Sequence, residues 1–259
     1  MPSHAEPGIL YIVGTGPGTP DQMTLDAVRA IQSADYVIGN ASYLTPLSDL
    51  VAGKNVIRSG MGKEVERAQQ AVELARDHVV AMVSGGDPGV YGMASIVLEV
   101  VEKCGVAIDV RVIPGVTAAN AAASRVGSPL SGDFCVISLS DLLTPMPEIE
   151  RRLNAAFSMG VPVVLYNPKS RGRPHNLGRA LEIAVQYHGP GTPVAVVKNA
   201  YRDGEQVMVT TLGDMGDHID DVDMHSTVII GGNESRLFRS GSHVKGIITP
   251  RGYHRKYVY

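Results

Sequence analysis

The sequence has little of what marks several classes of protein. It contains two cysteines, Cys104 and Cys135, and they lie far apart, so we expect neither a disulfide framework nor a metal cluster. The formal net charge is −3, whereas general nucleic-acid binding needs a basic surface. No apolar run reaches the roughly 20 residues that span a bilayer, and the N-terminal MPSHAEPG does not resemble a signal peptide. We expect a soluble, globular, cytoplasmic protein with neither nucleic-acid nor membrane partners.

Several glycine signatures of nucleotide and acyl chemistry are also missing. The stretch YIVGTGPGTPDQMTL predicts a strand, a glycine loop and a helix, but Thr19 stands where the dinucleotide fingerprint requires its third glycine. Pro17 removes a backbone N–H where a pyrophosphate needs donors. No GKS, GKT or GxSxG is present. The loop is therefore not predicted to hold a pyrophosphate.

What the sequence does contain is an alternation of β-rich and helical segments, which predicts an α/β fold. The predicted strands cover residues 9–13, 36–38, 79–83, 108–113, 134–139, 161–166, 193–198, 206–211 and 226–231. The predicted helices cover residues 21–33 (capped by Asp21), 65–76, 94–102, 147–157 and 177–187. Because the β-rich segments crowd the end of the second half, we expect a mixed sheet there. The predicted domains are residues 1–117 and 118–240, followed by a basic and aromatic extension, 241–259.

Four predicted strands end in unusual loops: GTGPGTP, SGGDPGVYG, IPGVTAAN and LYNPKSRGRP. Ligands of open α/β sheets bind outside the carboxyl ends of the strands. Glycine lets the backbone approach a ligand closely, and proline fixes the shape of a loop. A single loop of this kind is explained as well by ordinary strand-to-helix punctuation. Four of them together predict one ligand site.

Three of these stretches, YIVGTGPGTPDQMTLDA, SGGDPGVYGMA and IPGVTAANAAA, resemble the motifs of the tetrapyrrole (precorrin) methylase family. The resemblance extends over residues 8–237. It implies two α/β/α domains with S-adenosylmethionine in the cleft between them, S-adenosylhomocysteine as product, and a homodimer. Residues 59–75, LYNPKSRGRPHNL and the tail IITPRGYHRKY are similar to the branch that methylates C-17 of precorrin-3B or cobalt-factor III and contracts the ring. Both the metal-free and the cobalt-containing substrate remain open.

The resemblance also implies a set of cofactor contacts, of which Asn167 and Ala200 are aligned only by strand end. The set is Pro17, Gly85, Gly86, Asp87, Val90, Thr117, Ala118, Asn167 and Ala200. Asp87 has an alternative role as a turn residue bonded to its own backbone. No metal ligand is predicted.

Ring contraction requires proton movements, and the predicted catalytic candidates are Tyr43, Lys63 and His175. Some relatives carry an aspartate base at the end of the second strand. Asn40 stands there in this sequence and cannot act as a base. His175 is explained equally well as a surface or helix-start histidine.

A substrate with many carboxylates requires local positive charge. The predicted substrate contacts are Arg58, Lys63, Arg171 and Arg173. Arg67 is assigned instead to a solvated helix face. The cluster Arg251, Arg255 and Lys256 is expected either to cap the substrate or to pack at a dimer interface.

Two other functions compete with this hypothesis. Uroporphyrinogen methylases, other precorrin methylases and diphthine synthases share the first three motifs, but residues 59–75 and the TPRGY tail argue against them. A non-catalytic nucleotide-binding module would account for the glycine loops and leave the clustered arginines unexplained.

Overall fold

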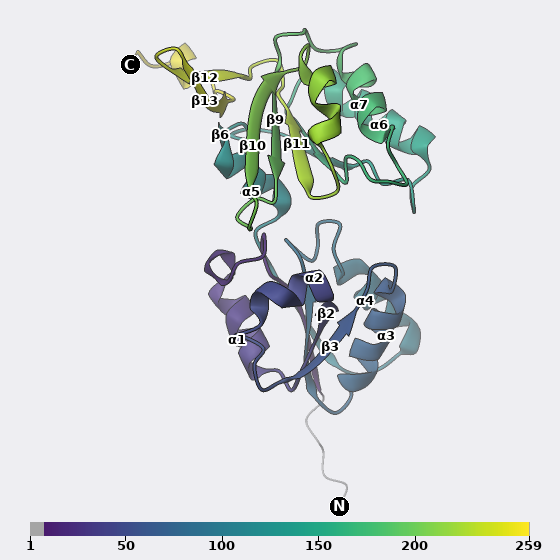
Figure 1. The fold of residues 1–259 in the computed structure, drawn as a ribbon. Coiled ribbons are helices and arrows are strands. Elements are labelled where there is room, and N and C mark those ends of the chain that lie inside the picture. The colour runs from purple at the N-terminus through teal and green to yellow at the C-terminus, as the bar shows by residue number, and fades with distance from the viewer. Residues whose placement is uncertain (1–7, 259) are drawn as a thin grey trace, which may run out of the picture. The chain divides into compact units, whose positions relative to one another are not determined.

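The structure is a computed structural model and describes residues 8–258 (Figure 1). The chain forms two compact units, unit 1 ending at Ala118 and unit 2 beginning at Ala119. Each unit contains its own five-stranded sheet. None of the helices in the described part of the chain is both long and apolar enough to cross a membrane.

Unit 1 is built on a wholly parallel sheet with the strand order β3-β2-β4-β1-β5. The strands are β1 (Ile9–Gly14), β2 (Tyr36–Asn40), β3 (Asn55–Ser59), β4 (Val79–Ser84) and β5 (Asp109–Ile113). Since all five run in one direction, their carboxyl ends lie at a single edge of the sheet. This edge carries the glycine loops that follow β1, β4 and β5.

Helices cover both faces of this sheet (Figure 1). On one face lie α1 (Leu25–Ser33) and α2 (Ala41–Leu44), which pack against Val13 of β1. On the other lie α3 (Glu64–Leu74) and α4 (Ala94–Cys104), which pack against Ile12. Burial on both faces explains why the central strands are continuous apolar runs in the sequence.

Unit 2 contains a mixed sheet with the strand order β10-β9-β11-β8-β7, which confirms the expected mixed topology. Its strands are β7 (Cys135–Ser138), β8 (Val163–Tyr166), β9 (Pro193–Lys198), β10 (Gln206–Thr211) and β11 (Ser226–Ile230). Because β11 is antiparallel to both β8 and β9, and β7 is parallel to β8, the carboxyl ends of β7, β8 and β9 share one edge.

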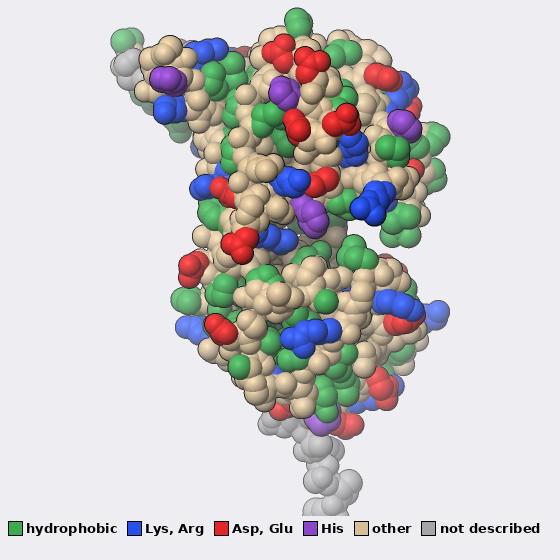
Figure 2. Space-filling view, viewed as in Figure 1, with side chains coloured by type: hydrophobic (Ala, Val, Ile, Leu, Met, Phe, Trp, Pro, Cys, Tyr) green, Lys and Arg blue, Asp and Glu red, His purple; other side chains and the backbone are tan. Residues whose placement is uncertain are grey.

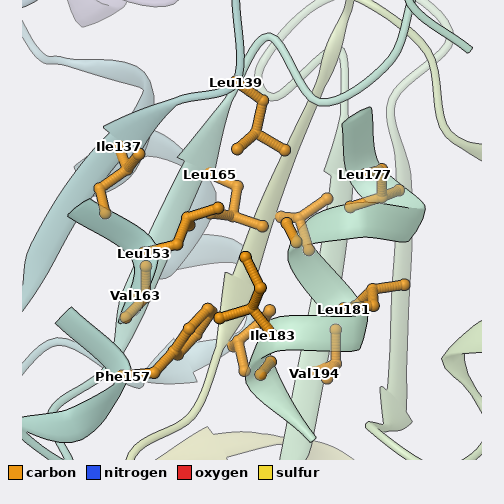
Figure 3. Close-up of a cluster of buried hydrophobic side chains, with 14 of the residues drawn as sticks. Ile137, Leu139, Leu153, Phe157, Val163, Leu165, Leu177, Leu181, Ile183 and Val194 are labelled. Carbon is orange, nitrogen blue, oxygen red and sulfur yellow. The ribbon is translucent and has the colours of Figure 1, made fainter. Parts of the chain in front are cut away.

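The core of unit 2 lies between this sheet and two helices, α6 (Met146–Ser158) and α7 (Asn176–Ala184). Figure 3 shows Leu153 and Phe157 of α6 beside Leu165 of β8 and Ile183 of α7. All four side chains are at most 1% exposed. This packing holds the edge that carries the β7 and β8 loops.

The C-terminal residues form a small sheet with a segment from the start of unit 2. The strands β12 (Arg236–Ser240) and β13 (His243–Ile248) form a hairpin, and β13 pairs with β6 (Gly127–Ser128), which follows α5 (Ala118–Arg125). Ile247 is fully buried, and the Thr249 hydroxyl donates to the Pro129 carbonyl at 2.6 Å. A domain boundary between residues 240 and 241 would fall in the turn of this hairpin.

One local prediction was wrong, and one strand was missed. Helix α1 begins at Leu25 and not at residue 21, since residues Pro20–Gln22 form a 3-10 turn and the Thr24 hydroxyl accepts the Ala27 N–H at 3.1 Å. Strand β3 was not predicted. It lies at the sheet edge and is only partly buried, and three of its five residues are polar, so it lacks an apolar run.

Candidate active site

Three glycines pack backbone against backbone where the loops after β1, β4 and β5 meet. A Cβ atom on Gly14 would lie 2.6 Å from the Gly115 nitrogen and 2.9 Å from the Gly86 oxygen. The Gly16 N–H donates to the Gly86 carbonyl at 3.1 Å, and the Gly86 N–H donates back at 2.8 Å. The glycines of GTGPG therefore allow the β1 and β4 loops to be joined through their backbones.

Asp87 fixes the same junction from the β4 loop. Its Oδ1 accepts the Gly89 N–H at 2.8 Å, and its Oδ2 accepts the Gly115 N–H at 3.0 Å. The first bond is the local turn contact that the sequence offered as an alternative role. The second reaches 28 residues along the chain to the β5 loop. Asp87 thus holds two predicted cofactor loops together.

Other predicted residues of unit 1 gather around this junction. The ring of Tyr43 lies against Gly85 so closely that a Cβ atom there would be 2.8 Å from Cζ of the ring. A Cβ on Gly86 would lie 3.7 Å from Cα of Thr117 and 3.8 Å from the nitrogen of Ala118. Two further predicted residues lie in the joined loops, buried Pro17 and half-buried Val90.

Asn40, at the carboxyl end of β2, acts as a helix cap. Its Oδ1 accepts both the backbone N–H of Ser42 at 2.9 Å and the Ser42 hydroxyl at 2.7 Å. These bonds cap α2, a role for which asparagine is well suited. Its Nδ2 is buried and has no hydrogen-bond partner among the described residues.

Backbone strain marks the loops after β4, β8 and β9 independently of any motif. The non-glycine residues of the described chain with positive φ are Tyr91, Asn167, Asn199 and Tyr201. They follow β4, β8 and β9, and the last two flank the predicted cofactor residue Ala200. Such strain persists only where the surroundings impose it, and it concentrates at functional sites. Asn167 is further held by a bond from its Nδ2 to the Ser138 hydroxyl at 2.9 Å.

A non-local cluster that the sequence did not predict fixes the β9 loop. The Tyr201 hydroxyl lies 2.8 Å from that of Ser124, and the guanidinium of Arg125 lies 5.0 Å from the Tyr201 ring centroid. Glu205 accepts the Tyr201 N–H at 2.7 Å and pairs with Arg125 at 2.6 Å. Burial raises the pKa of Glu205, but the Tyr201 and Arg125 contacts outweigh it and leave that pKa below its ordinary value.

In the basic loop after β8, some side chains form hydrogen bonds or ion pairs and others form none within the described residues. The Arg173 side chain is 13% exposed. Its Nη1 donates to the Ser140 hydroxyl at 2.7 Å, and its Nε lies 3.9 Å from the Asp141 carboxylate. Arg173 therefore joins the β8 loop to the β7 loop. Lys169 bonds Asp220 at 2.7 Å and lowers the pKa of that carboxyl. Arg171 and His175 are exposed, and neither side chain has a hydrogen bond or ion pair within the described residues. His175 directly precedes α7 and makes no side-chain cap bond.

The structure corrects the prediction for one of the basic residues of unit 1, Arg67. Arg58 and Lys63 are exposed, and Lys63 pairs with Glu66 at 2.6 Å. Arg67 was assigned to a solvated face, and this was wrong, since only 4% of it is exposed. It lies on the stripe of α3 that faces the sheet, next to Ala68 and one turn before Ala71.

Figure 2 shows acidic and basic side chains interspersed on the face drawn. Within residues 8–258, no group of three or more His, Cys, Asp or Glu side chains is placed to hold a metal ion.

Comparison with known proteins identifies several that are similar in sequence to this chain. It is 47% identical over 246 residues to the "Probable cobalt-factor III C(17)-methyltransferase" of Salmonella typhimurium, covering 95% of this chain and 99% of that protein. It is 40% identical over 250 residues to the "Precorrin-3B C(17)-methyltransferase" of Sinorhizobium sp, covering 95% and 97%. It is also 45% identical to the "Cobalamin biosynthesis protein CbiHC" of Archaeoglobus fulgidus, of which it spans about half, 54%.

Solved structures that are similar to this chain are also named as methyltransferases. The "methyltransferase CobJ" superposes with a TM-score of 0.86 at 32% identity, covering 94% of this chain and all of that one. The uroporphyrin-III C-methyl transferase of Thermus thermophilus, complexed with S-adenosyl homocysteine, gives a TM-score of 0.67 at 25% identity, covering 86% and 97%. The model of the family Tetrapyrrole (Corrin/Porphyrin) Methylases matches residues 9–216, and the chain therefore belongs to that family.

Proposed function

We propose that the chain is an S-adenosylmethionine-dependent methyltransferase that methylates C-17 of precorrin-3B or cobalt-factor III, with ring contraction, in cobalamin biosynthesis. The observation that carries the proposal is the junction of the β1, β4 and β5 loops on Gly14, Gly86 and Gly115, in a chain whose near full-length relatives bear the names of this reaction. We further propose that the enzyme is a cytoplasmic homodimer.

The residues of the junction fit S-adenosylmethionine. This cofactor is a cation with a ribose and an amino-acid end, so it needs backbone donors, backbone acceptors and a shaped wall more than it needs opposite charge. Because Gly85 and Gly86 carry no side chains, Tyr43 packs closely against the first and the backbone of Thr117 against the second, which shapes this wall. Asp87 directs both carboxylate oxygens to backbone amides, so it contributes by fixing the loops that would hold the cofactor.

The bound cofactor supplies a methyl group already activated by its sulfonium. The chain therefore has to position the ring carbon and exclude water, and positioning contributes up to roughly 7–11 kcal/mol in favourable cases. Arg171 and Arg58, both exposed, are suited to the peripheral carboxylates of the substrate. Tyr43, Lys63 and His175 remain the candidates for holding or moving a proton during ring contraction.

The test is anaerobic incubation of the protein and S-adenosylmethionine with precorrin-3B and, separately, with cobalt-factor III, followed by mass spectrometry. A gain of one methyl group on either substrate is the expected result, and it identifies the route that the enzyme serves. No gain on both, with S-adenosylhomocysteine still bound in calorimetry, would refute the substrate and favour another methylase activity. Thermal protection by ATP, with no response to S-adenosylmethionine, would favour a non-catalytic nucleotide-binding module instead.

Light scattering of the purified protein tests the oligomeric state. A single species of twice the chain mass is expected, and a monomer at assay concentration would contradict the dimer.

A further inference from the structure

We infer that Arg67 is a positioning residue that fixes the loop of residues 59–63, the "β3 loop", and with it the place of Lys63 at the carboxyl edge of unit 1. This inference rests on the proposed function, in which Arg58 is a substrate contact at this edge and Lys63 is a candidate for holding or moving a proton. The residue reaches the loop from the first turn of α3.

The guanidinium of Arg67 joins several segments at once. Its Nη1 donates to the Ser59 hydroxyl at 2.6 Å and to the Gly60 carbonyl at 3.2 Å, which are the end of β3 and the start of the loop. Its Nη2 lies 3.6 Å from the sulfur of Met93, which directly precedes α4. One planar group therefore holds the β3 loop and touches the segment that leads out of the β4 loop.

The β3 loop has few other supports. A Cβ on Gly60 or Gly62 would meet no atom within 4 Å, and Met61 is 72% exposed. Gly62 has a φ of +78°, and its N–H donates to Glu64 at 3.1 Å in an exposed bond. The loop is thus open on its outer side, and its inner side is held through Arg67.

The electrostatics argue against a role in stability alone. The nearest carboxylate in contact, Glu64, lies 3.7 Å away and is itself 39% exposed, so the buried charge is only partly compensated. The Arg67 Nε is buried without a hydrogen-bond partner among residues 8–258. The same holds for Nδ2 of Asn40, whose strand position pairs with Ser59. An apolar side chain of similar length serves a core at least as well as such a charge.

The test compares Arg67→Met with a matched control, Arg76→Met. Arg76 lies just past the end of α3, and its exposed guanidinium pairs with Glu73 of that helix. In Arg67→Met we expect an unfolding temperature close to wild type, a KM for the tetrapyrrole raised about tenfold or more, and affinity for S-adenosylhomocysteine within about twofold. The control should match wild type in all three. An unchanged KM in Arg67→Met would overturn the inference.

Two further variants separate the guanidinium fork from its charge and guard against misfolding. Arg67→Lys keeps the charge but not the planar fork, so it should remain impaired, and full activity would show that charge alone matters. Ser59→Ala removes the closest partner and should raise KM in the same direction, and by less. If Arg67→Met does not fold, an unchanged KM in Ser59→Ala together with full activity in Arg67→Lys would overturn the inference.

Amide hydrogen exchange needs no substrate, so it tests the positioning of the β3 loop separately from the proposed function. Amide hydrogen exchange at residues 60–62 should speed up in Arg67→Met and stay at the wild-type rate in Arg76→Met. Failure of the wild type to methylate either tetrapyrrole would refute the proposed function while leaving this measurement valid. Unchanged exchange in Arg67→Met would refute the positioning of the loop whatever the substrate.

Discussion

Removal of the Asp87 carboxylate tests the loop junction most directly. In Asp87→Ala, the N–H groups of Gly89 and Gly115 both lose their acceptor. Hydrogen bonds to a charged acceptor contribute about 1.5–3 kcal/mol each, and the Gly89 bond is exposed, so its contribution falls below that range. We therefore expect unit 1 to lose about 2–4 kcal/mol of unfolding free energy and the affinity for S-adenosylhomocysteine to fall sharply.

The assays are urea denaturation followed by circular dichroism, amide exchange at Gly89 and Gly115, and calorimetry with S-adenosylhomocysteine. Asp87→Asn keeps one acceptor oxygen, so about half of the stability loss should remain. Asp109→Ala is the control, since Asp109 forms an exposed pair with Arg111 and should contribute less than about 1 kcal/mol. Full protection of both amides in Asp87→Ala would refute the tie, and unchanged affinity would remove Asp87 from the cofactor site.

Three further substitutions probe other parts of the structure. Gly115→Ala should unfold or severely destabilise unit 1, because its Cβ would lie 2.9 Å from Cα of Gly14, whereas Gly60→Ala has open space and should leave the urea midpoint unchanged. Gly178→Ala, inside α7 and also with open space, should raise the unfolding free energy by about 0.5–1 kcal/mol; a loss would show hidden crowding. Burial lowers the pKa of His188, so below about pH 6.5 the unfolded chain takes up the proton first and stability declines as pH falls. His188→Leu should flatten this decline in urea titrations between pH 7 and pH 5, and an equal slope in both proteins would contradict it.

The sequence predicted features that depend on neighbouring residues and missed those that depend on distant ones. Glycine and proline act within a few residues, so the loops after β1, β4 and β5 were located correctly. The edge strand β3 has no apolar run of its own and is recognised only by its pairing with β2. Thr24, rather than Asp21, caps α1 because the turn at Pro20–Gln22 delays the helix.

The residues around the candidate site illustrate the same limit. Arg67 lies on the face of α3 that also carries Ala71, and this spacing was a usable signal for its burial. Its charge alone led to the assignment on a solvated face. The Tyr201 cluster joins residues 77 and 80 positions apart, which no local pattern can indicate. Arg173 looked like a free cation in the sequence, and only the structure shows its bond to Ser140.

The order of the strands has a consequence for how the chain is made. In unit 1 the first strand, β1, is interior and needs both β4 and β5, so its sheet is complete once residue 113 has left the ribosome, and the unit itself ends at Ala118. In unit 2, the Pro129 carbonyl can accept its hydrogen bond from the Thr249 hydroxyl only after another 120 residues have been synthesised. At a synthesis rate of about 5–20 residues per second, this interval lasts roughly 6–24 s.

During that interval β6 has no partner, because β13 is the last strand to emerge. A nascent chain therefore carries a finished first unit and an unfinished second one until synthesis is nearly over. A message truncated before residue 243 would yield a protein in which the exposed residues 127–128 of unit 2 lack their strand partner β13. Such a product is a target for quality-control proteases even though most of its sequence is present.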